Sequence, residues 1–317
     1  MWPRRWAGGK PAALLPAREV LTSAGAGRDI RPYTGDEVTS TRPVAWDPSR
    51  MGEPLPEAGV AIRAVSDALE VALARVGAAD VTRKDGRDVV TATDMRIEDQ
   101  VRGMLHDALG SVVVGEERGG DAAPAGTYWL LDPICGTRNY ASGIPLYCVN
   151  LALIRDRVPA LAAVGDPSTG DVLVAQAGAG AWALRANTGA RRLRASASSQ
   201  TLVIEDSHAD GPQREHAAQF AAAAIRANRW DLRSLSSTLS LAYLAAGRVS
   251  GYALFWTSPV HAAAGSLLAA EAGAVVTDLH GRPWTIGSGS LLAAADARLH
   301  AQLLKLVATA GRAAEPA

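Results

Sequence analysis

Cysteine is scarce in this sequence, which has only Cys135 and Cys148 among its 317 residues. Two cysteines without paired spacing make neither a disulfide framework nor a zinc ribbon, so the sequence favours a reducing compartment such as the cytoplasm. Net charge is also lacking, because 32 lysines and arginines balance 32 aspartates and glutamates. A chain without a global electrostatic field has no general attraction for nucleic acid or for an anionic membrane.

Long apolar segments are missing as well. No run approaches the roughly 20 apolar residues that a membrane-spanning helix needs. The N-terminus lacks the apolar core and the small-residue cleavage site of a secretory signal. We therefore expect a soluble, cytoplasmic protein with no membrane or nucleic-acid partner. The apolar content, 48% of all residues, is ample for a hydrophobic core.

The first part of the chain differs in composition from the rest. Residues 1–55 are rich in Pro, Gly, Arg, Ser and Thr and show no sustained apolar period, which is typical of a flexible extension. Met51 is a plausible initiator, so some of this extension could lie upstream of the natural start. Residues 56–317 are predicted to form one domain, with an α+β half over about 56–200 and an α/β half over about 201–312.

Apolar periodicity predicts two helices, then a run of strands, and then alternating helices and strands. The first helix, over 58–77, has an apolar stripe that includes Ile62, Val65 and Leu69, and the second covers 95–109. Short apolar runs predict strands over 111–114, 128–131, 147–154, 160–164, 171–174, 201–204, 252–255 and 274–276, and longer stretches predict helices over 213–227, 236–246 and 261–272. This order is typical of a layered α/β/α/β arrangement.

The most informative stretch is W-L-L-D-P-I-C-G-T-R-N-Y, over residues 129–140. Three further blocks accompany it, which are D-V-V-T-A-T-D over 88–94, G-E-E over 115–117, and H-A-A-A-G over 261–265 with E-A-G and Asp278 after it. In this order the blocks resemble the inositol-monophosphatase-like family, with its patterns D-x-V-T-x-x-D, G-E-E, W-x-x-D-P-I-D-G-T-x-N-F/Y and W-D-x-A-A-G. The resemblance covers about residues 58–312 and implies an inositol-monophosphatase-like α/β/α/β sandwich.

The resemblance also implies where magnesium ions bind in the family. One ion is held at the positions of Glu116, Asp132 and the carbonyl group of Ile134. A second ion shares Asp132, but its two other ligand positions hold Cys135 and His261 in this chain instead of aspartates. A thiol is a poor ligand for magnesium and a good nucleophile. The resemblance therefore implies that this chain keeps the ligands of one metal site. At the second site, both ligands other than Asp132 are replaced.

Cys135 and His261 are predicted to be neighbours, because side chains that bind one ion lie within about 4–6 Å of each other. A thiol beside an imidazole is a nucleophile–base pair, which is commonly completed by an acid that orients the imidazole. Asp132 and Asp166 are both candidates for that acid. His261 begins a helix, whose field disfavours a protonated histidine and favours a nearby thiolate. Cys148, inside an apolar run, is predicted to be a small core residue.

With Cys135 and His261 at these two positions, the chain resembles one branch of the family, the Dieckmann cyclases of tetramate and pyridone antibiotic biosynthesis. These enzymes use a Cys-His-Asp set without metal. The resemblance implies that Cys135 takes a β-ketoamide aminoacyl chain from a carrier-protein thioester, and that intramolecular C-acylation releases a tetramic acid or pyridone. It implies no cofactor, an acyl or peptidyl carrier protein as partner, and it leaves a homodimer open. Gly136 and Thr137 are then predicted to stabilise the oxyanion, and Arg233 and Glu116 to contact the substrate.

Three other interpretations stay open. The first is a magnesium-dependent phosphatase of small sugar or cyclitol phosphates that uses Glu116, Asp132 and Thr137 with a degraded second metal site. The second is a zinc site made by Cys135, His261, Asp132 and Glu116. The third is a non-catalytic relic that binds a partner or a phosphorylated ligand.

Overall fold

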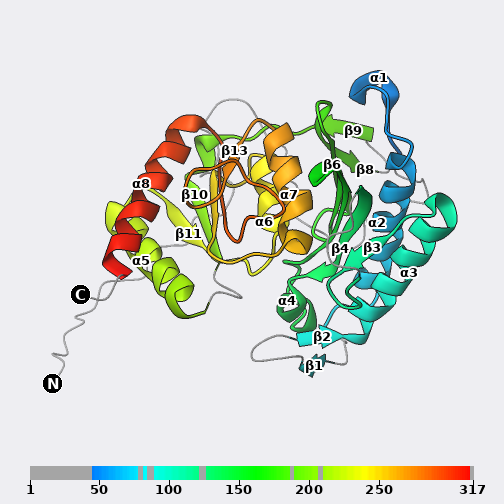
Figure 1. Ribbon diagram of the computed structural model, residues 1–317, viewed down its shortest axis with the longest axis horizontal. Helices are drawn as coiled ribbons and strands as arrows, with labels where there is room; N and C mark the ends of the chain where they lie inside the picture. Colours follow the sequence, from blue (N-terminus) through cyan, green and yellow to red (C-terminus); the bar gives the residue numbers. More distant parts are fainter. Residues whose placement is uncertain are drawn as a thin grey trace, which may run out of the picture. The chain divides into compact units, whose positions relative to one another are not determined.

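The computed structural model describes residues 45–77, 81–83, 89–120, 126–185, 189–205 and 210–314, all of which belong to one unit, Asp36–Ala317 (Figure 1). Its first layer is a pair of helices, α2 (Ala58–Leu73) and α3 (Ala92–Leu109). α2 buries Ile62, Val65 and Leu69 on one face, as its apolar period predicts. The strand β1 (Val81–Arg83) pairs antiparallel with β2 (Val89–Thr91), which leads directly into α3.

The larger sheet has seven strands in the order β3-β4-β5-β6-β7-β8-β9. Their bounds are β3 (Val113–Gly115), β4 (Thr127–Cys135), β5 (Cys148–Arg155), β6 (Val158–Asp166), β7 (Asp171–Gln176), β8 (Gly180–Arg185) and β9 (Gly189–Arg192). β3 runs parallel to β4, and every other neighbouring pair is antiparallel. Side chains of a strand point alternately to the two faces of the sheet. Trp129 and Leu131 therefore join the core under α2, while Tyr128 and Leu130 join a second core on the opposite face.

The smaller sheet has five strands in the order β11-β10-β12-β14-β13. Their bounds are β10 (Thr201–Glu205), β11 (Asp231–Arg233), β12 (Gly251–Leu254), β13 (Val275–Thr277) and β14 (Leu291–Ala294). β10 is parallel to both β11 and β12, whereas β14 is antiparallel to β12 and β13. Leu202 and Ile204 share a core with α5 (Gly211–Ala227) and α8 (Ala297–Ala314). Val203 faces the other way, toward α6 (Leu239–Ala245) and α7 (Pro259–Glu271).

The alternation of buried side chains defines the order of the layers. α2 and α3 cover one face of the seven-stranded sheet, and α6 and α7 lie between the two sheets. α5 and α8 cover the far face of the five-stranded sheet (Figure 1). The predicted layered α/β sandwich is confirmed, with α5 and α8 as an additional outer layer. Because the middle layer touches both sheets, a residue on α7 can meet the ends of strands from either one.

Most predicted elements are present, and their ends differ by a few residues. The helix predicted over 58–77 ends at Leu73, and the one predicted over 95–109 begins at Ala92. Within the domain, no element was predicted at β1, β2, β8, β9, β11, β14, α4 (Thr137–Ala141) or α8, where the chain forms strands and helices. β14 has four residues and is defined by its pairing with β12 and β13, which a local apolar pattern does not specify. Among the described residues, no helix combines the length and the apolar character that crossing a membrane requires.

Part of the predicted N-terminal extension packs on the domain. Residues 48–51 form the short helix α1 (Pro48–Met51), which Asp47 caps by accepting a hydrogen bond from the backbone N–H of Ser49. Met51 is buried in the core with α2, and Arg50 donates a hydrogen bond to the carbonyl of Ala190 at 3.0 Å. Residues of α1 therefore contact the domain even though they precede the predicted boundary. Residues 1–44 of the extension are outside the described residues.

The contact between α6 and α7 leaves no room for a side chain at Gly265. A Cβ atom there would lie 2.6 Å from the Cβ of Leu241, whereas a Cβ at the exposed Gly103 of α3 would meet nothing within 4 Å. Gly265→Ala is expected to lower the free energy of unfolding by about 1–3 kcal/mol through overpacking. The matched control Gly103→Ala is expected to raise it by about 0.5–1 kcal/mol through helix propensity. Urea unfolding measures both, and equal effects would contradict this packing.

Candidate functional site

The site is built around the end of β4, where the strand leaves the seven-stranded sheet. β4 pairs with β5 so that Asp132 lies opposite Asn150 and Cys135 opposite Cys148, with a register shift between the two pairs. Gly136 then takes a left-handed conformation with φ +102°, and a Cβ atom there would lie 2.9 Å from the carbonyl oxygen of Leu146. Only glycine fits that turn without strain. The irregular strand end and the turn bring Asp132 and Cys135 to the same place.

His261 reaches this place from the first turn of α7. Its Nδ1 lies 2.8 Å from Oδ2 of Asp132, and the Asp132 side chain is fully buried. Asp132 therefore holds the imidazole. Asp166, the other acid predicted for this role, is buried at the end of β6 and forms an ion pair with Arg248 at 3.2 Å. Asp166 also accepts hydrogen bonds from Ser168 in the turn that leads to β7, so it stabilises that turn.

Cys135 is the last residue of β4 and is buried, with 7% of its surface exposed. Its Sγ lies 2.9 Å from Oγ1 of Thr238 and accepts a hydrogen bond from the Thr238 backbone N–H at 3.3 Å. Asn150 donates to Thr238 Oγ1 at 2.6 Å and to the carbonyl of His261 at 3.3 Å. One Asp132 oxygen, the Cys135 sulfur and one His261 nitrogen all lie within 4.8 Å of one another. The predicted proximity of Cys135 and His261 is present in the structure.

The pKa values of these groups reflect burial and close contact. The side chain of Cys148 and burial raise the pKa of the Cys135 thiol well above its usual value, and His261 only partly opposes this rise. Burial lowers the pKa of His261, but its hydrogen bonds to Asp132 and Cys135 outweigh burial and raise the pKa. Both directions are opposite to those expected from the field of the α7 N-terminus. Burial and the neighbouring Cys148 thus disfavour the thiolate form of Cys135, whereas His261 favours it.

A group of carboxylates lies on the other side of Asp132. Burial raises the pKa of Asp132 to about 7. Burial also raises the pKa of Asp94 to about 6, and the nearby charge of Glu116 adds to the rise. Glu116 lies close enough to Asp132 to influence its pKa, and Oδ1 of Asp132 is buried without a hydrogen-bond partner in the described part of the chain. Crowded carboxylates with an unpartnered buried oxygen are well suited to bind a divalent cation.

Thr137 joins this group from the first residue of α4 (Thr137–Ala141). Its Oγ1 lies 3.0 Å from the carbonyl oxygen of Ile134 and 3.4 Å from Oδ1 of Asp94. Asp94 itself is fixed in a capping box at the start of α3, where it accepts a hydrogen bond from the backbone N–H of Thr91 at 2.9 Å. Asp88, the first residue of the same sequence block, lies outside the described residues.

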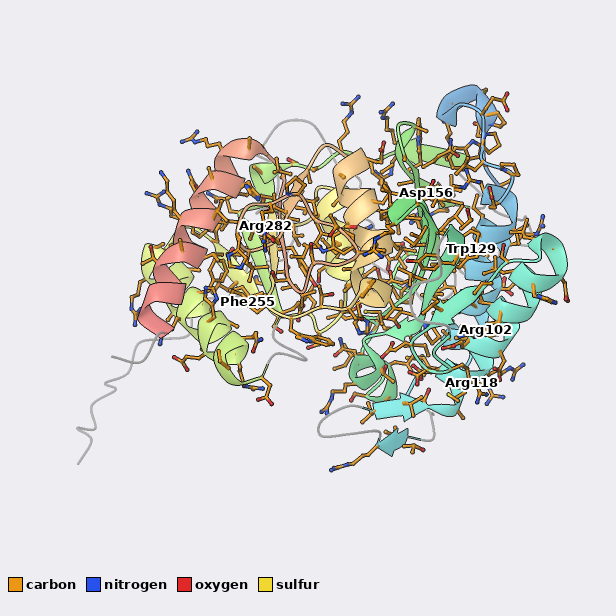
Figure 2. The ribbon with its side chains drawn as sticks, viewed as in Figure 1. Arg102, Arg118, Trp129, Asp156, Phe255 and Arg282 are labelled. Carbon is orange, nitrogen blue, oxygen red and sulfur yellow. The ribbon has the colours of Figure 1, made fainter. Side chains whose placement is uncertain are left out.

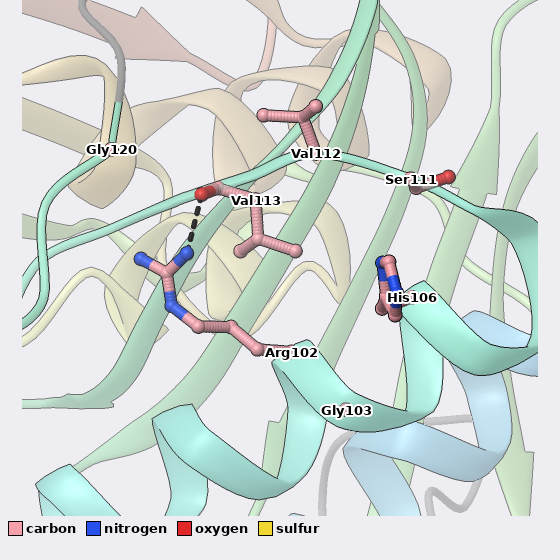
Figure 3. A pocket seen from close by; sticks show the side chains of 7 residues that line it. All are labelled: Arg102, Gly103, His106, Ser111, Val112, Val113 and Gly120. Atoms are coloured by element: carbon pink, nitrogen blue, oxygen red, sulfur yellow. Dashed lines mark hydrogen bonds between the residues drawn. The ribbon is translucent and has the colours of Figure 1, made fainter.

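The turn that carries Glu116 is fixed by a buried ion pair on α3. Glu98 is fully buried and accepts hydrogen bonds from the backbone N–H groups of Glu117 and Arg118, at 2.8 and 3.0 Å. Arg102 pairs with Glu98 at 2.7 Å and donates to the carbonyl of Val113 at 2.6 Å (Figures 2 and 3). The hollow in Figure 3 lies between α3 and the segment that leads into β3, and none of the predicted site residues lines it.

Glu205 and Thr238, which the sequence analysis did not single out, join the site through the segment after β11. Glu205, at the end of β10, is buried and accepts hydrogen bonds from the backbone N–H groups of Leu235 and Ser236, at 2.8 and 2.9 Å. This segment places Ser237, whose hydroxyl donates to the carbonyl of Cys135 at 2.8 Å, and Thr238 beside the sulfur. No sequence motif marks Glu205. Its position beside the segment after β11 follows only from the pairing of β10 with β11.

Three predicted residues have other surroundings than expected. Arg233 is exposed on β11, and its guanidinium donates to the carbonyl of Leu232 at 2.7 Å. Gly136 forms the turn after Cys135, and the carbonyl of Cys135 accepts a hydrogen bond from the Ser237 hydroxyl. Cys148 is fully buried, as predicted, but it is also the cross-strand neighbour of Cys135. The spacing of the two cysteines in the sequence did not predict that they are neighbours, because the pairing of β4 with β5 brings them together.

Comparisons with known proteins give a consistent result. The family model described as "Inositol monophosphatase family" matches residues 55–312. "Inositol-1-monophosphatase ImpA" of Mycolicibacterium smegmatis is 36% identical over 73% of this chain and 84% of its own length. "Probable inositol 1-monophosphatase ImpA" of Mycobacterium tuberculosis is 36% identical over 81% and 95%. The solved inositol monophosphatase from Anabaena (Nostoc) sp. PCC 7120 is 26% identical, covers 79% of this chain and 94% of that chain, and has a TM-score of 0.65.

These relatives overturn the interpretation as a Dieckmann cyclase. The matched proteins carry the names of phosphatases, and not of enzymes that cleave thioesters or form tetramates in antibiotic biosynthesis. The prediction of a carbon–carbon bond-forming cyclase is therefore wrong. The high pKa and the burial of the Cys135 thiol agree with this correction, because a nucleophilic cysteine needs a stabilised thiolate.

The anchoring of residues 234–238 by Glu205 can be tested. In Glu205→Gln the buried carboxylate that accepts backbone N–H groups is lost, and the free energy of unfolding is expected to fall by about 1.5–3 kcal/mol. Labelling is measured in a Cys148→Ala background, so that Cys135 is the cysteine that reacts. Adding Glu205→Gln to this background is expected to speed the reaction of Cys135 with a thiol reagent, because Thr238 no longer covers its sulfur. Glu215→Gln, at an exposed position of α5, is the matched control and should change neither quantity. An unchanged labelling rate in Glu205→Gln would show that Glu205 does not hold this segment.

Proposed function

The chain belongs to the inositol monophosphatase family, and from this premise we propose that it hydrolyses small phosphate monoesters of the sugar- or cyclitol-phosphate class with a divalent cation. The observation that carries the proposal is the gathering of Asp94, Glu116 and Asp132 beside Thr137. The names of the relatives describe those proteins, and they support the same class of reaction for this chain. The substrate class follows the phosphatase interpretation of the sequence blocks.

The donor set beside Glu116 fits a hard divalent cation. Glu116, Asp132 and the carbonyl of Ile134 supply oxygen atoms only, which is the donor type that Mg²⁺ prefers. The unpartnered Oδ1 of Asp132 is a buried acceptor that such an ion would satisfy. When bound, the ion neutralises the phosphate charge and lowers the pKa of a coordinated water. These residues would hold it at the ends of β3 and β4.

Thr137 and Asp94 are suited to orient the attacking water. When the Thr137 hydroxyl donates its hydrogen to Asp94 or to the carbonyl of Ile134, its oxygen remains free to accept a hydrogen bond from water. Asp94, with a pKa of about 6, can receive a proton near neutral pH. The position of each group is fixed locally, by the capping box at Asp94 and by the first turn of α4 at Thr137. The water would therefore meet a preorganised acceptor pair.

The proposal predicts release of inorganic phosphate from sugar or inositol monophosphates in the presence of Mg²⁺, and loss of this activity with a chelator. Asp94→Asn and Thr137→Val are each expected to lower kcat by about 10²-fold or more, because each removes one partner of the attacking water. Phosphate release is measured with wild type and variants at matched protein concentration. Asp107→Asn, at an exposed position of the same helix as Asp94, is the control and should keep full activity.

Two results would contradict the proposal. One is the absence of phosphate release from every tested monoester at any Mg²⁺ or Mn²⁺ concentration in folded protein, which would favour a non-catalytic relic. The other is activity that survives Asp94→Asn and Thr137→Val together, because the hydrolysis would then come from another site or from a contaminating phosphatase.

A further inference from the structure

We propose that Asp132, Cys135 and His261 form a binding site for a zinc-class divalent ion, adjacent to the oxygen-rich site at Glu116. The three side chains come from β4 and α7 and offer one oxygen, one sulfur and one nitrogen within 4.8 Å of one another. Binding of this ion does not depend on phosphatase activity, so the inference goes beyond the proposed function. Together the two sites would make a centre with one hard and one borderline ion.

The donor types select the ion. Mg²⁺ takes oxygen ligands in octahedral geometry and does not bind thiols, whereas Zn²⁺ and Co²⁺ bind thiolate, imidazole and carboxylate. Three protein ligands with a fourth position open to water is the usual composition of a catalytic zinc site. The replacement that makes this site poor for magnesium therefore makes it favourable for zinc.

The geometry needs little change to accept the ion. Zinc bonds of about 2.0–2.3 Å in a tetrahedral arrangement place ligand atoms about 3.3–3.8 Å apart. Oδ2 of Asp132 and Nδ1 of His261 are already 2.8 Å apart, and the sulfur lies within 4.8 Å of both ligand residues. Small side-chain rotations are enough, because the backbone at each ligand is fixed by the β4–β5 pairing or by α7.

Supporting contacts around the three ligands resemble the outer shell of a metal site. Thr238 contacts the Cys135 sulfur through both its hydroxyl and its backbone N–H, and N–H donation to sulfur stabilises a bound thiolate. Asn150 connects Thr238 to the carbonyl of His261, which ties two ligands to one polar residue.

Cobalt provides a direct test, because Co²⁺ replaces Zn²⁺ and gives a near-ultraviolet charge-transfer band only when a thiolate is a ligand. Chelator-treated full-length protein is titrated with Co²⁺ under reducing conditions, and the charge-transfer band is expected to saturate at one equivalent. Zn²⁺ added afterwards is expected to displace the cobalt and abolish the band. Mg²⁺ at a large excess is expected to leave the band in place.

Variants assign the band to the three ligands. Cys135→Ala is expected to abolish it, and His261→Ala to weaken Co²⁺ binding at least tenfold. Cys148→Ala is the matched control, since this buried cysteine lies on the neighbouring strand and is not one of the three ligands, and it should retain the band. Cys135→Asp supplies a carboxylate of similar size and is expected to bind Co²⁺ without the charge-transfer band. Circular dichroism confirms that each variant is folded.

The outcomes separate this inference from the proposed function. No charge-transfer band in folded wild type, or a band lost equally in Cys148→Ala, overturns the metal site and leaves a metal-free Cys-His-Asp set. A band that persists in Asp94→Asn and Thr137→Val, together with the absence of phosphate release from wild type, retains the metal site and overturns only the phosphatase. Phosphate release with Mg²⁺ alone, together with the absence of the cobalt band, retains the phosphatase and overturns only the zinc-class metal site.

Discussion

The hydrogen bond between Asp132 and His261 joins the seven-stranded sheet to the helical layer between the sheets, and the arrangement of the site depends on it. Asp132 is fully buried at the end of β4, and His261 lies on the first turn of α7. A buried carboxylate is costly unless it is hydrogen-bonded or paired. His261 supplies one partner at Oδ2, and the other oxygen has no hydrogen-bond partner among the residues that the structure describes. The same side chain therefore explains the position of the histidine and belongs to both of the proposed cation sites.

The middle helical layer is the reason why residues from distant parts of the chain meet. α6 and α7 pack against both sheets, so the start of α7 faces the end of β4 while α6 follows the segment that Glu205 anchors. Close packing between these helices, which permits only glycine at position 265, fixes their separation. Thr238, the residue before α6, and His261, on α7, thus approach Cys135 from the starts of two different helices. A shift of either helix would change both sides of the site together.

The altered positions change the chemistry more than the shape. The chain keeps the fold of its family, and the end of β4, the Gly136 turn and α7 bring a thiol and an imidazole together. The Cys148 thiol and burial raise the pKa of the Cys135 thiol. This environment argues against a free nucleophile and agrees with a thiol that loses its proton only to a cation. The phosphatase interpretation and the altered ligands are therefore compatible.

Sequence patterns predicted a large part of this protein, including the two N-terminal helices, most strands, the layered fold and the proximity of Cys135 to His261. These features follow from local apolar periods and from motifs whose spacing is tied to one fold. The patterns did not choose between Asp132 and Asp166 as the partner of His261, because both follow strand residues and only the packing of α7 distinguishes them. They also missed Glu205, Asn150 and Thr238, which carry no motif.

The sequence by itself determined that positions 135 and 261 carry a thiol and an imidazole, because side-chain chemistry is independent of folding. Tertiary structure decided the state of those groups. The pairing of β4 with β5 placed Cys148 beside Cys135 and raised the pKa of its thiol, and burial raised that of Asp132 to about 7. Such shifts arise from desolvation and from neighbours distant along the chain, so no local pattern of residues encodes them.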